Sequence, residues 1–401
     1  MTVLNVAVLG AGNRAQDHLS TLSRLAPLCT LVGVADPDES RASAAGARFG
    51  CPHFNDLATM LTEARPDLLY VIIPPDGHHA AVELAGRHGV HVVSETPIAT
   101  TLPLADAMIA SAARHRITLE VSENVWRWPL ERLKKRIIDA GLIGEVTQVH
   151  LWYYSGSYHG VSIARTLIGS TPTRVQGYTR ETPVPPHRDR VDRTYTVGPY
   201  EHGLIEFANG ALCVYQYPLH PLHRNYWDVL GTTGALIGND LVLYRDGERH
   251  VYPLQQEKVP LGDGEALVRV FVETDPPLVW ENPYRDLPIG AGADDIGRTD
   301  ILAGTRQAIQ EGGAPAYGAA LARNDQEVLL ALRESARRGG AWLDLPLTAL
   351  TAGEQALHDD YTRRYGHDPL GDVEVVLAVQ HPRNTPTELA LLRYHEEKAP
   401  G

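Results

Sequence analysis

The sequence predicts an α/β domain with a parallel β-sheet, followed by a second domain with a large, mainly antiparallel β-sheet flanked by helices. Three observations predict this arrangement. Over residues 1–122, short apolar runs rich in β-branched residues alternate with amphipathic stretches of helical length. A glycine-rich turn follows the first of these runs. Beyond residue 123, strand-like runs follow one another with few helical stretches between them, as in a mainly antiparallel sheet.

The first domain is predicted to contain five strands joined by helices. The apolar runs lie at residues 6–9, 31–35, 68–73, 90–93 and 118–121. Helical periodicity is clearest at residues 14–25, 80–88 and 104–115. Because the apolar runs are continuous rather than alternating, we expect helices to cover both faces of the sheet. This is the arrangement of a Rossmann-type domain.

The second domain is predicted to open with a helix that starts at Pro129, since proline suits the first helical turn. Strands are predicted at residues 146–153, 174–179, 204–207, 211–217, 226–230 and 242–244. Asn209-Gly210 is a strong hairpin signal between two of them. We expect residues 262–297 to form an irregular crossing segment, because they are rich in Pro, Gly and Asp. Helices follow at residues 300–311 and 324–338, with a last one near 386–397.

Composition argues against several classes of function. Hydrophobic residues make up 43% of the chain, and its formal net charge of −13 disfavours binding to nucleic acid. The basic residues 132, 134, 135 and 136 are expected to form the solvent-facing side of one helix. No uninterrupted apolar stretch reaches about 18 residues, so we expect no membrane span, and the first apolar run is too short for the core of a signal peptide.

The three cysteines, Cys29, Cys51 and Cys213, are far apart and form no CxxC pair. A thiol metal site and a disulfide framework are therefore both disfavoured, which fits a reducing cytoplasm. His220 and His223 resemble a metal pair only superficially, because Pro221 lies between them and no acidic or cysteine partner stands at ligand spacing. We expect no metal.

The glycine-rich turn predicts a dinucleotide site. Gly10 permits a tight turn, Gly12 lets the backbone approach a pyrophosphate, and Ala15 allows close packing of strand and helix. Asn13 and Arg14 complete the turn, and the following helix presents free N–H groups to phosphates. Asp36 ends the next predicted strand, where a carboxylate binds both ribose hydroxyls and repels a 2′-phosphate. NAD is therefore favoured over NADP. The alternatives are a nucleotide-free glycine turn and a merely exposed Arg14.

Several short motifs occur in order along the chain, together with His18. They are Gly10–Ala15, Ile73-Pro74-Pro75-Asp76-Gly77-His78, Glu95-Thr96-Pro97, Asn124-Val125-Trp126-Arg127-Trp128-Pro129, and residues 141–146, 229–234 and 343–347. Through these motifs the sequence resembles the glucose–fructose oxidoreductase / inositol 2-dehydrogenase / MocA family over residues 4–347. The resemblance implies that substrate binds between the nicotinamide ring and the antiparallel sheet, and that the chain forms homo-oligomers through that sheet.

The pattern along the chain predicts three segments, and the resemblance adds a set of site residues. Residues 1–122 would be the NAD-binding domain, 123–347 the substrate and oligomerisation domain, and 348–401 an appended extension. The cofactor set would add Pro74, Pro75, His78, Glu95, Thr96, Pro97 and Asn124 to the turn residues and Asp36. The candidate substrate set consists of Trp126, Arg127, Ser155, His159 and His202.

The departures from the family fall on its proton-transfer chemistry. Thr96 stands where the family has a lysine, and a hydroxyl supplies no charge and does not titrate near neutrality. His159 matches the family's histidine, but Ser155 replaces the aspartate four residues before it. Tyr158 and Tyr154 are candidate substitutes, as is Tyr153, because a tyrosine whose pKa is lowered can pass a proton. The alternatives are aromatic packing for the tyrosines and a structural role for His159.

Three hypotheses about function follow. The first is an NAD(P)-dependent oxidoreductase that transfers a hydride between nicotinamide and a CH–OH or C=O group of a small sugar-like or cyclitol-like molecule. The second is an enzyme that keeps NAD bound and performs no net redox, so that transient oxidation permits elimination, epimerisation or glycoside cleavage. The third is a non-catalytic protein that binds NAD or a partner, since a fold does not fix a function.

Overall fold

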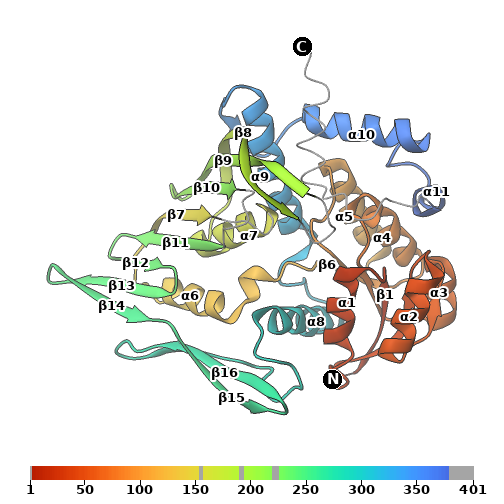
Figure 1. Cartoon of the computed structure of the whole chain (residues 1–401), viewed down its shortest axis with the longest axis horizontal. Helices are drawn as coiled ribbons and strands as arrows, with labels where there is room; N and C mark the ends of the chain where they lie inside the picture. The colour runs from red at the N-terminus through yellow and green to blue at the C-terminus, as the bar shows by residue number, and fades with distance from the viewer. Residues whose placement is uncertain (1, 153–156, 189–193, 219–224, 379–401) are drawn as a thin grey trace. The chain divides into compact units, whose positions relative to one another are not determined.

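We analysed a computed structural model that describes residues 2–152, 157–188, 194–218 and 225–378 (Figure 1). These residues form two compact units. The first consists of residues 2–124, 284–326 and 354–378, and the second of the described residues within 125–283 together with 327–353. Both units therefore take segments that are far apart in the sequence, and each is described by itself below.

The first unit is built around a six-stranded, fully parallel sheet in the order β3-β2-β1-β4-β5-β6. Its strands are β1 (Leu4–Leu9), β2 (Cys29–Ala35), β3 (His53–Phe54), β4 (Leu68–Val71), β5 (His91–Ser94) and β6 (Leu119–Val121). The predicted strands are confirmed, and β3, a short edge strand, is added to them. The carboxyl ends of all these strands meet at one edge of the sheet, where ligands of such folds bind.

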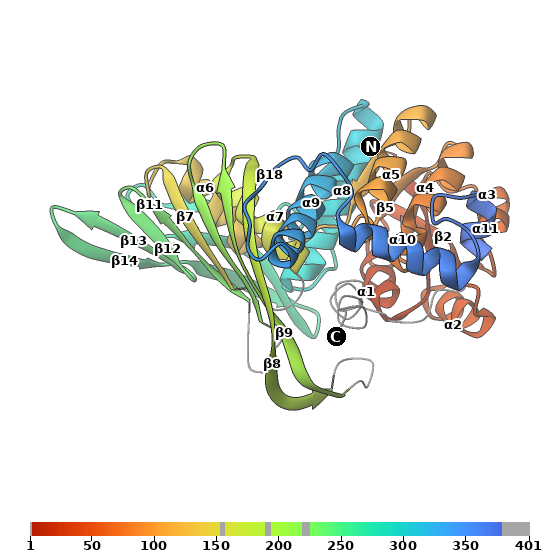
Figure 2. The same ribbon diagram turned by 90° about the horizontal axis from the view of Figure 1, so that it is seen from above.

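Helices cover this sheet, as the continuous apolar runs predicted. They are α1 (Asn13–Leu22), α2 (Glu39–Phe49), α3 (Leu57–Ala64), α4 (His78–Arg87), α5 (Leu102–His115), α8 (Ala293–Glu311), α10 (Ala352–Tyr365) and α11 (Val373–Ala378). Three come from late in the chain, and of these α8 packs on α1 and α11 packs on α4. Figure 2 shows α10 and α11 alongside α4 and α5.

The second unit contains a nine-stranded sheet in the order β14-β13-β12-β11-β7-β10-β9-β8-β18. Its strands are β7 (Val146–Trp152), β8 (Pro172–Arg188), β9 (Thr194–Phe207), β10 (Leu212–Pro218), β11 (Tyr226–Gly231), β12 (Gly234–Ile237), β13 (Asp240–Arg245), β14 (Glu248–Pro253) and β18 (Leu343–Asp344). Only the β7–β10 pair is parallel among these described strands. The hairpin predicted at Asn209-Gly210 joins β9 to β10.

Helices cover one face of this sheet. They are α6 (Pro129–Asp139), α7 (Ser157–Ile168) and the second half of α9 (Gly318–Arg337), preceded by the short turn η2 (Val125–Arg127). The backbone of α9 approaches β8 so closely that a Cβ on Gly177 would lie 1.9 Å from the carbonyl oxygen of Leu332. Arg333 of α9 also forms a buried ion pair with Glu201 of β9 at 2.8 Å.

Two predictions about the second unit are wrong. Residues 262–297 are not irregular, because they contain β16 (Gly264–Val272), β17 (Leu278–Glu281) and the start of α8, and β16 pairs with β15 (Gln255–Leu261).

The basic residues of α6 do not all face solvent. Lys134 is 3% exposed and pairs with Glu131 at 2.9 Å, while Glu131 accepts a hydrogen bond from the indole of Trp227.

The described part of the C-terminal extension is tied to the first unit. Glu354, which is fully buried, accepts a hydrogen bond from the backbone N–H of Leu102 at the start of α5, at 2.7 Å. The side chains of Thr101 and His358 are 2.8 Å apart, and the ring of His79 donates to the carbonyl of Pro369 at 2.6 Å. The helix predicted near residues 386–397 lies outside the described residues.

Candidate functional site

The glycine-rich turn between β1 and α1 has the backbone that its sequence predicts. Gly10 has a φ of +102°, and a Cβ at this position would lie 2.1 Å from the carbonyl oxygen of Ile72. Only glycine fits there. A Cβ on Gly12 would instead meet no atom of the described residues within 4 Å, so open space lies in front of the turn.

The N-terminus of α1 faces that open space without a side-chain cap from the described residues. Gly12 is the N-cap, and Ala15 in the first turn is completely buried. Uncapped N–H groups at a helix N-terminus carry a partial positive charge and favour an anion. The turn can therefore receive a phosphate through backbone groups alone.

Asp36, directly after β2, is 4% exposed, and its carboxylate forms two hydrogen bonds and one ion pair. It accepts hydrogen bonds from the backbone N–H groups of Ala11 and Asp38, both at 2.9 Å. Arg41 of α2 lies 3.0 Å from the same carboxylate. Our sequence reasoning missed Arg41, although Asp38 is a typical helix N-cap residue and would have placed Arg41 in the first turn of α2. The carboxylate is thus held at the glycine turn and is partly neutralised.

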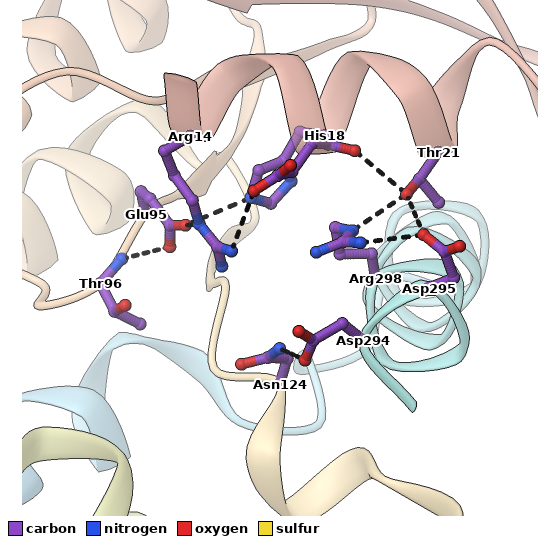
Figure 3. Close-up of polar contacts among 10 residues, drawn as sticks. Arg14, His18, Thr21, Glu95, Thr96, Asn124, Asp294, Asp295 and Arg298 are labelled. Atoms are coloured by element: carbon purple, nitrogen blue, oxygen red, sulfur yellow. Dashed lines mark hydrogen bonds and ion pairs between the residues drawn. The ribbon is translucent and has the colours of Figure 1, made fainter. Parts of the chain in front are cut away.

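Glu95, directly after β5, is 6% exposed and contacts two side chains of α1 (Figure 3). The side chain of Arg14 bonds to one of its oxygens, and the Nε2 atom of His18 is 3.2 Å from the same oxygen. The other oxygen accepts the backbone N–H of Thr96 at 2.6 Å. Arg14 therefore links the glycine turn to the Glu95-Thr96-Pro97 segment.

The charges of this cluster balance. Burial alone would raise the pKa of Glu95, but the charge of Arg14 and the hydrogen bond from His18 outweigh burial, so this pKa lies well below its usual value. Burial lowers the pKa of His18, whose neutral ring then donates its Nε2–H to Glu95. The ionised Glu95 therefore faces the charged guanidinium of Arg14.

The other residues of the Pro74–His78 turn surround the end of β4. Pro74 and Pro75 are half-buried, whereas His78 is completely buried. Its Nε2 atom is 2.9 Å from the carbonyl of Ile73, and its Nδ1 atom is 3.2 Å from the hydroxyl of Ser94. His78 therefore braces the turn from inside, and its direct contact with a cofactor stays a prediction. Pro97, like Thr96, is half-buried.

Asn124, just after β6, lies against α8. It is 5% exposed, and its side-chain nitrogen donates to Asp294 at 2.6 Å (Figure 3). The neighbouring Asp295 turns to α1 instead, where it accepts from Thr21 at 3.0 Å and from Arg298 at 2.9 Å. Residues from a segment 170 positions later thus complete this edge of the sheet, which the sequence reasoning did not foresee.

The proton-transfer candidates of the second unit lie on α7. Tyr158 is 2% exposed and its ring centroid is 6.0 Å from that of His159, which is half-buried. The turn η2 packs against α7. It carries Trp126 and the buried Arg127, whose guanidinium lies 4.4 Å from the centre of the Trp126 ring. Tyr154 and Ser155, together with Tyr153, lie outside the described residues.

The structure does not bring His202 to these residues. Glu201 and Gly203 of β9 face α9, so His202 between them points to the opposite face of the sheet. There its ring centroid lies 4.1 Å from that of Tyr200. Helix α7 packs on β7, whose buried side chains are Val149 and Leu151. His202 and Tyr200 lie on the opposite face of the sheet.

The described residues were also searched for metal-binding groups and for membrane-spanning helices. Among the described residues, no group of three or more His, Cys, Asp or Glu side chains is arranged to hold a metal ion. No helix in the described part of the chain is long and apolar enough to cross a membrane.

The sequence is similar to a family of oxidoreductases and to several dehydrogenases. Residues 4–123 match the family model described as "Oxidoreductase family, NAD-binding Rossmann fold". The chain is similar to a D-apiose dehydrogenase of Paraburkholderia graminis, with 33% identity over 34% of this chain and 37% of that protein. It is also similar to inositol 2-dehydrogenase 2 of Saccharopolyspora erythraea, with 25% identity over 50% of this chain and 65% of that protein. The matches thus span less than two thirds of these relatives.

Solved structures extend the likeness to the whole fold. A levoglucosan dehydrogenase in complex with NADH has a TM-score of 0.65 and 20% identity, covering 86% of this chain and 100% of that chain. An NAD-binding oxidoreductase from Klebsiella pneumoniae has a TM-score of 0.69 and 20% identity, with the same coverage. Residues 4–123 are therefore similar to the oxidoreductase family with an NAD-binding Rossmann fold, and the solved structures share the fold of the chain.

Proposed function

We propose that this protein is an NAD-dependent oxidoreductase that transfers a hydride between nicotinamide and a CH–OH or C=O carbon of a small polyhydroxylated molecule. The observation that carries the proposal is the open space at Gly12, bordered by the uncapped α1 N-terminus and by Asp36. The residues fit the cofactor: backbone N–H groups suit its pyrophosphate, and the Asp36 carboxylate suits its ribose hydroxyls. Bound NAD supplies the hydride acceptor.

The preference for NAD over NADP is part of this proposal. A 2′-phosphate beside the buried Asp36 carboxylate would meet a like charge. Arg41 offsets that repulsion, because its guanidinium lies 3.0 Å from Asp36. We therefore propose a preference for NAD that Arg41 weakens, so that removing Arg41 would sharpen it.

Side chains of this protein would transfer the proton of the reacting hydroxyl group. In our proposal His159 accepts or returns the proton of the reacting hydroxyl, because its ring is half-buried and sits on α7 beside Tyr158. Tyr158 would hold the substrate oxygen through its hydroxyl group, and the role of Thr96 stays a prediction from the sequence. Trp126 and Arg127 would line the substrate side of η2, and the roles of Tyr154 and Ser155 stay predictions from the sequence.

A panel of polyols, cyclitols and sugar derivatives tests this reaction. Substrate added with NAD should produce the NADH absorbance band, and His159→Ala should lower kcat by about 10²–10⁴-fold, the usual contribution of general acid–base catalysis. His202→Ala is the matched control, because it removes a histidine from the opposite face of the sheet. Turnover that is unchanged in His159→Ala would contradict the assignment.

A redox-neutral reaction is the second candidate, and one observation favours it. The only cation bonded to Glu95 among the described residues is Arg14, which does not titrate, and Thr96 replaces the lysine of the family. Without that proton carrier a protein could retain NAD and use transient oxidation only. A product of unchanged mass, or one that has lost water, formed without free NADH would favour this candidate.

We also propose that the protein is cytoplasmic and forms homo-oligomers through the open face of the nine-stranded sheet. Cys29, Cys51 and Cys213 are buried free thiols, which suits a reducing compartment. Large apolar side chains are exposed on the open face, among them Tyr178 at 55%, Tyr226 at 47% and Ile237 at 40%. Exposed apolar patches mark association surfaces.

A further inference from the structure

Asn124 lies shortly after the end of β6 in the first unit and is 5% exposed. It follows β6, as Glu95 follows β5 and Gly10 follows β1, so the three residues share the carboxyl edge of the parallel sheet. Ligands of such sheets bind at this edge. Figure 3 shows Asn124 and Asp294 on the same side of α1 as Arg14 and Thr96.

The bond to Asp294 fixes which way the Asn124 amide points. A carboxylate accepts hydrogen bonds and donates none, so the NH2 group of Asn124 must face Asp294. The distance between the two atoms is 2.6 Å. The carbonyl oxygen of the amide must then point away from Asp294 and is an acceptor, which suits a ligand that offers an N–H or O–H group.

The helix that carries Asp294 is held firmly against this edge. A Cβ on Gly297 would lie 3.2 Å from the backbone oxygen of Asn124, so α8 touches the Asn124 backbone directly. Asp295 secures the same helical turn to Thr21 of α1 and to Arg24 just after α1, at 3.0 and 3.1 Å. Asp294 is thereby placed by the fold rather than by a flexible loop.

Asp294 also belongs electrostatically to the candidate site. The charge of Glu95 raises the pKa of Arg14 most, and the charge of Asp294 raises it further. Asp294 is itself exposed. This exposed carboxylate therefore bonds to a buried amide and also acts through its charge on the cation of the glycine turn.

We propose that Asp294 is a positioning residue that orients Asn124 so that its amide oxygen accepts a hydrogen bond from the nicotinamide riboside half of the cofactor. This inference rests on the proposed function. The donor would be either the carboxamide N–H of nicotinamide or a hydroxyl of the adjacent ribose. Sequence matching over residues 4–123 does not reach Asp294.

Calorimetry with three probes tests the inference: NAD, ADP-ribose and ADP. ADP lacks the whole nicotinamide riboside, and ADP-ribose lacks only the nicotinamide. Asp294→Ala should weaken NAD about tenfold, the loss expected for one hydrogen bond to a charged group, and should leave ADP unchanged. ADP-ribose weakened equally identifies the ribose hydroxyl as donor, whereas unchanged ADP-ribose identifies the carboxamide.

The controls separate positioning from folding. Asp295→Ala removes the neighbouring charge of the same helical turn but no bond to Asn124, so it should leave the ratio of NAD to ADP affinity unchanged. Asp294→Asn retains an acceptor oxygen and should restore most of the NAD affinity. In an Asn124→Ala background, Asp294→Ala should have no further effect, because the two residues act through one bond.

The outcomes distinguish the inference from the proposed function. If the wild-type protein binds no NAD, the proposed function fails and the inference with it. If the wild type binds NAD and Asp294→Ala binds it equally well, only the inference fails. Equal losses of NAD and ADP affinity in Asp294→Ala, or additive effects with Asn124→Ala, would also overturn it, because they would indicate a general structural role.

Discussion

At the scale of single residues, Gly10 and Gly12 separate folding from binding. Gly10→Ala should lower the free energy of unfolding by at least about 2 kcal/mol, because its φ of +102° and the Ile72 carbonyl leave no room for a Cβ. Gly12→Ala should change stability by less than about 0.5 kcal/mol yet abolish NAD binding, because the new methyl group would occupy open space. Chemical denaturation and calorimetry on both variants measure the two effects. Equal stabilities, or normal NAD binding by Gly12→Ala, would contradict this account.

His18 should make the stability of the protein depend on pH. Burial lowers its pKa below the ordinary histidine value of about 6.5, so below that pH the unfolded chain binds a proton that the folded chain does not. Stability contributed by this group is therefore complete above pH 6.5 and is lost as the pH falls. His18→Gln should reduce the slope of unfolding free energy against pH by up to about 1.4 kcal/mol per pH unit.

Denaturation of both proteins between pH 8 and pH 5 measures this slope. At pH 8 His18 is neutral in both states, so the difference between the two proteins there gives the effect of the substitution itself. Parallel curves down to pH 5 would show that His18 titrates as in the unfolded chain.

At the scale of elements, the C-terminal extension should stabilise the first unit through α5. Glu354→Ala would leave the buried N–H of Leu102 without its acceptor, which should cost about 1–3 kcal/mol of unfolding free energy. Glu354→Gln retains an acceptor oxygen and should lose less. Gln355→Ala is the control, since Gln355 is exposed and donates a hydrogen bond to Asp359 of the same helix. Thermal unfolding of the three variants measures these effects. If Glu354→Ala is as stable as the wild type, the capping role of Glu354 is contradicted.

The elements also show what the sequence could predict and what it could not. Continuous apolar runs and the glycine turn predicted the parallel sheet, because both signals are local. The strands β16 and β17 were missed, since Pro, Gly and Asp around them suggested an irregular segment while their pairing with β15 is set by tertiary contacts. Lys134 was misplaced for a similar reason: its buried partners Glu131 and Trp227 cannot be read from helical periodicity.

The candidate site shows the same division. Gly10, Asp36 and Glu95 could be predicted, because each directly follows a strand and the carboxyl edge of a parallel sheet gathers such residues. Arg41 could have been found from the N-cap at Asp38. Asp294 could not, because its contact with Asn124 spans 170 positions of sequence and carries no local signal.

At the scale of the whole molecule, the open face of the nine-stranded sheet should bind a second copy of the chain. Tyr226→Glu combined with Ile237→Glu should shift the protein to a lower mass, because charges on a buried apolar interface are costly. Val259→Glu, at an apolar position 43% exposed on the separate three-stranded sheet, is the control. Light scattering measures the mass, and a wild-type monomer, or a mass unchanged by the double substitution, would contradict the proposal.

The most direct test of the central claim is titration of the purified protein with NAD and with NADP by calorimetry, after any cofactor carried through purification has been removed. We predict one NAD bound per chain, with NADP bound more weakly because of the Asp36 carboxylate. Binding of neither nucleotide would contradict the account and would leave the non-catalytic hypothesis as the better explanation of this fold.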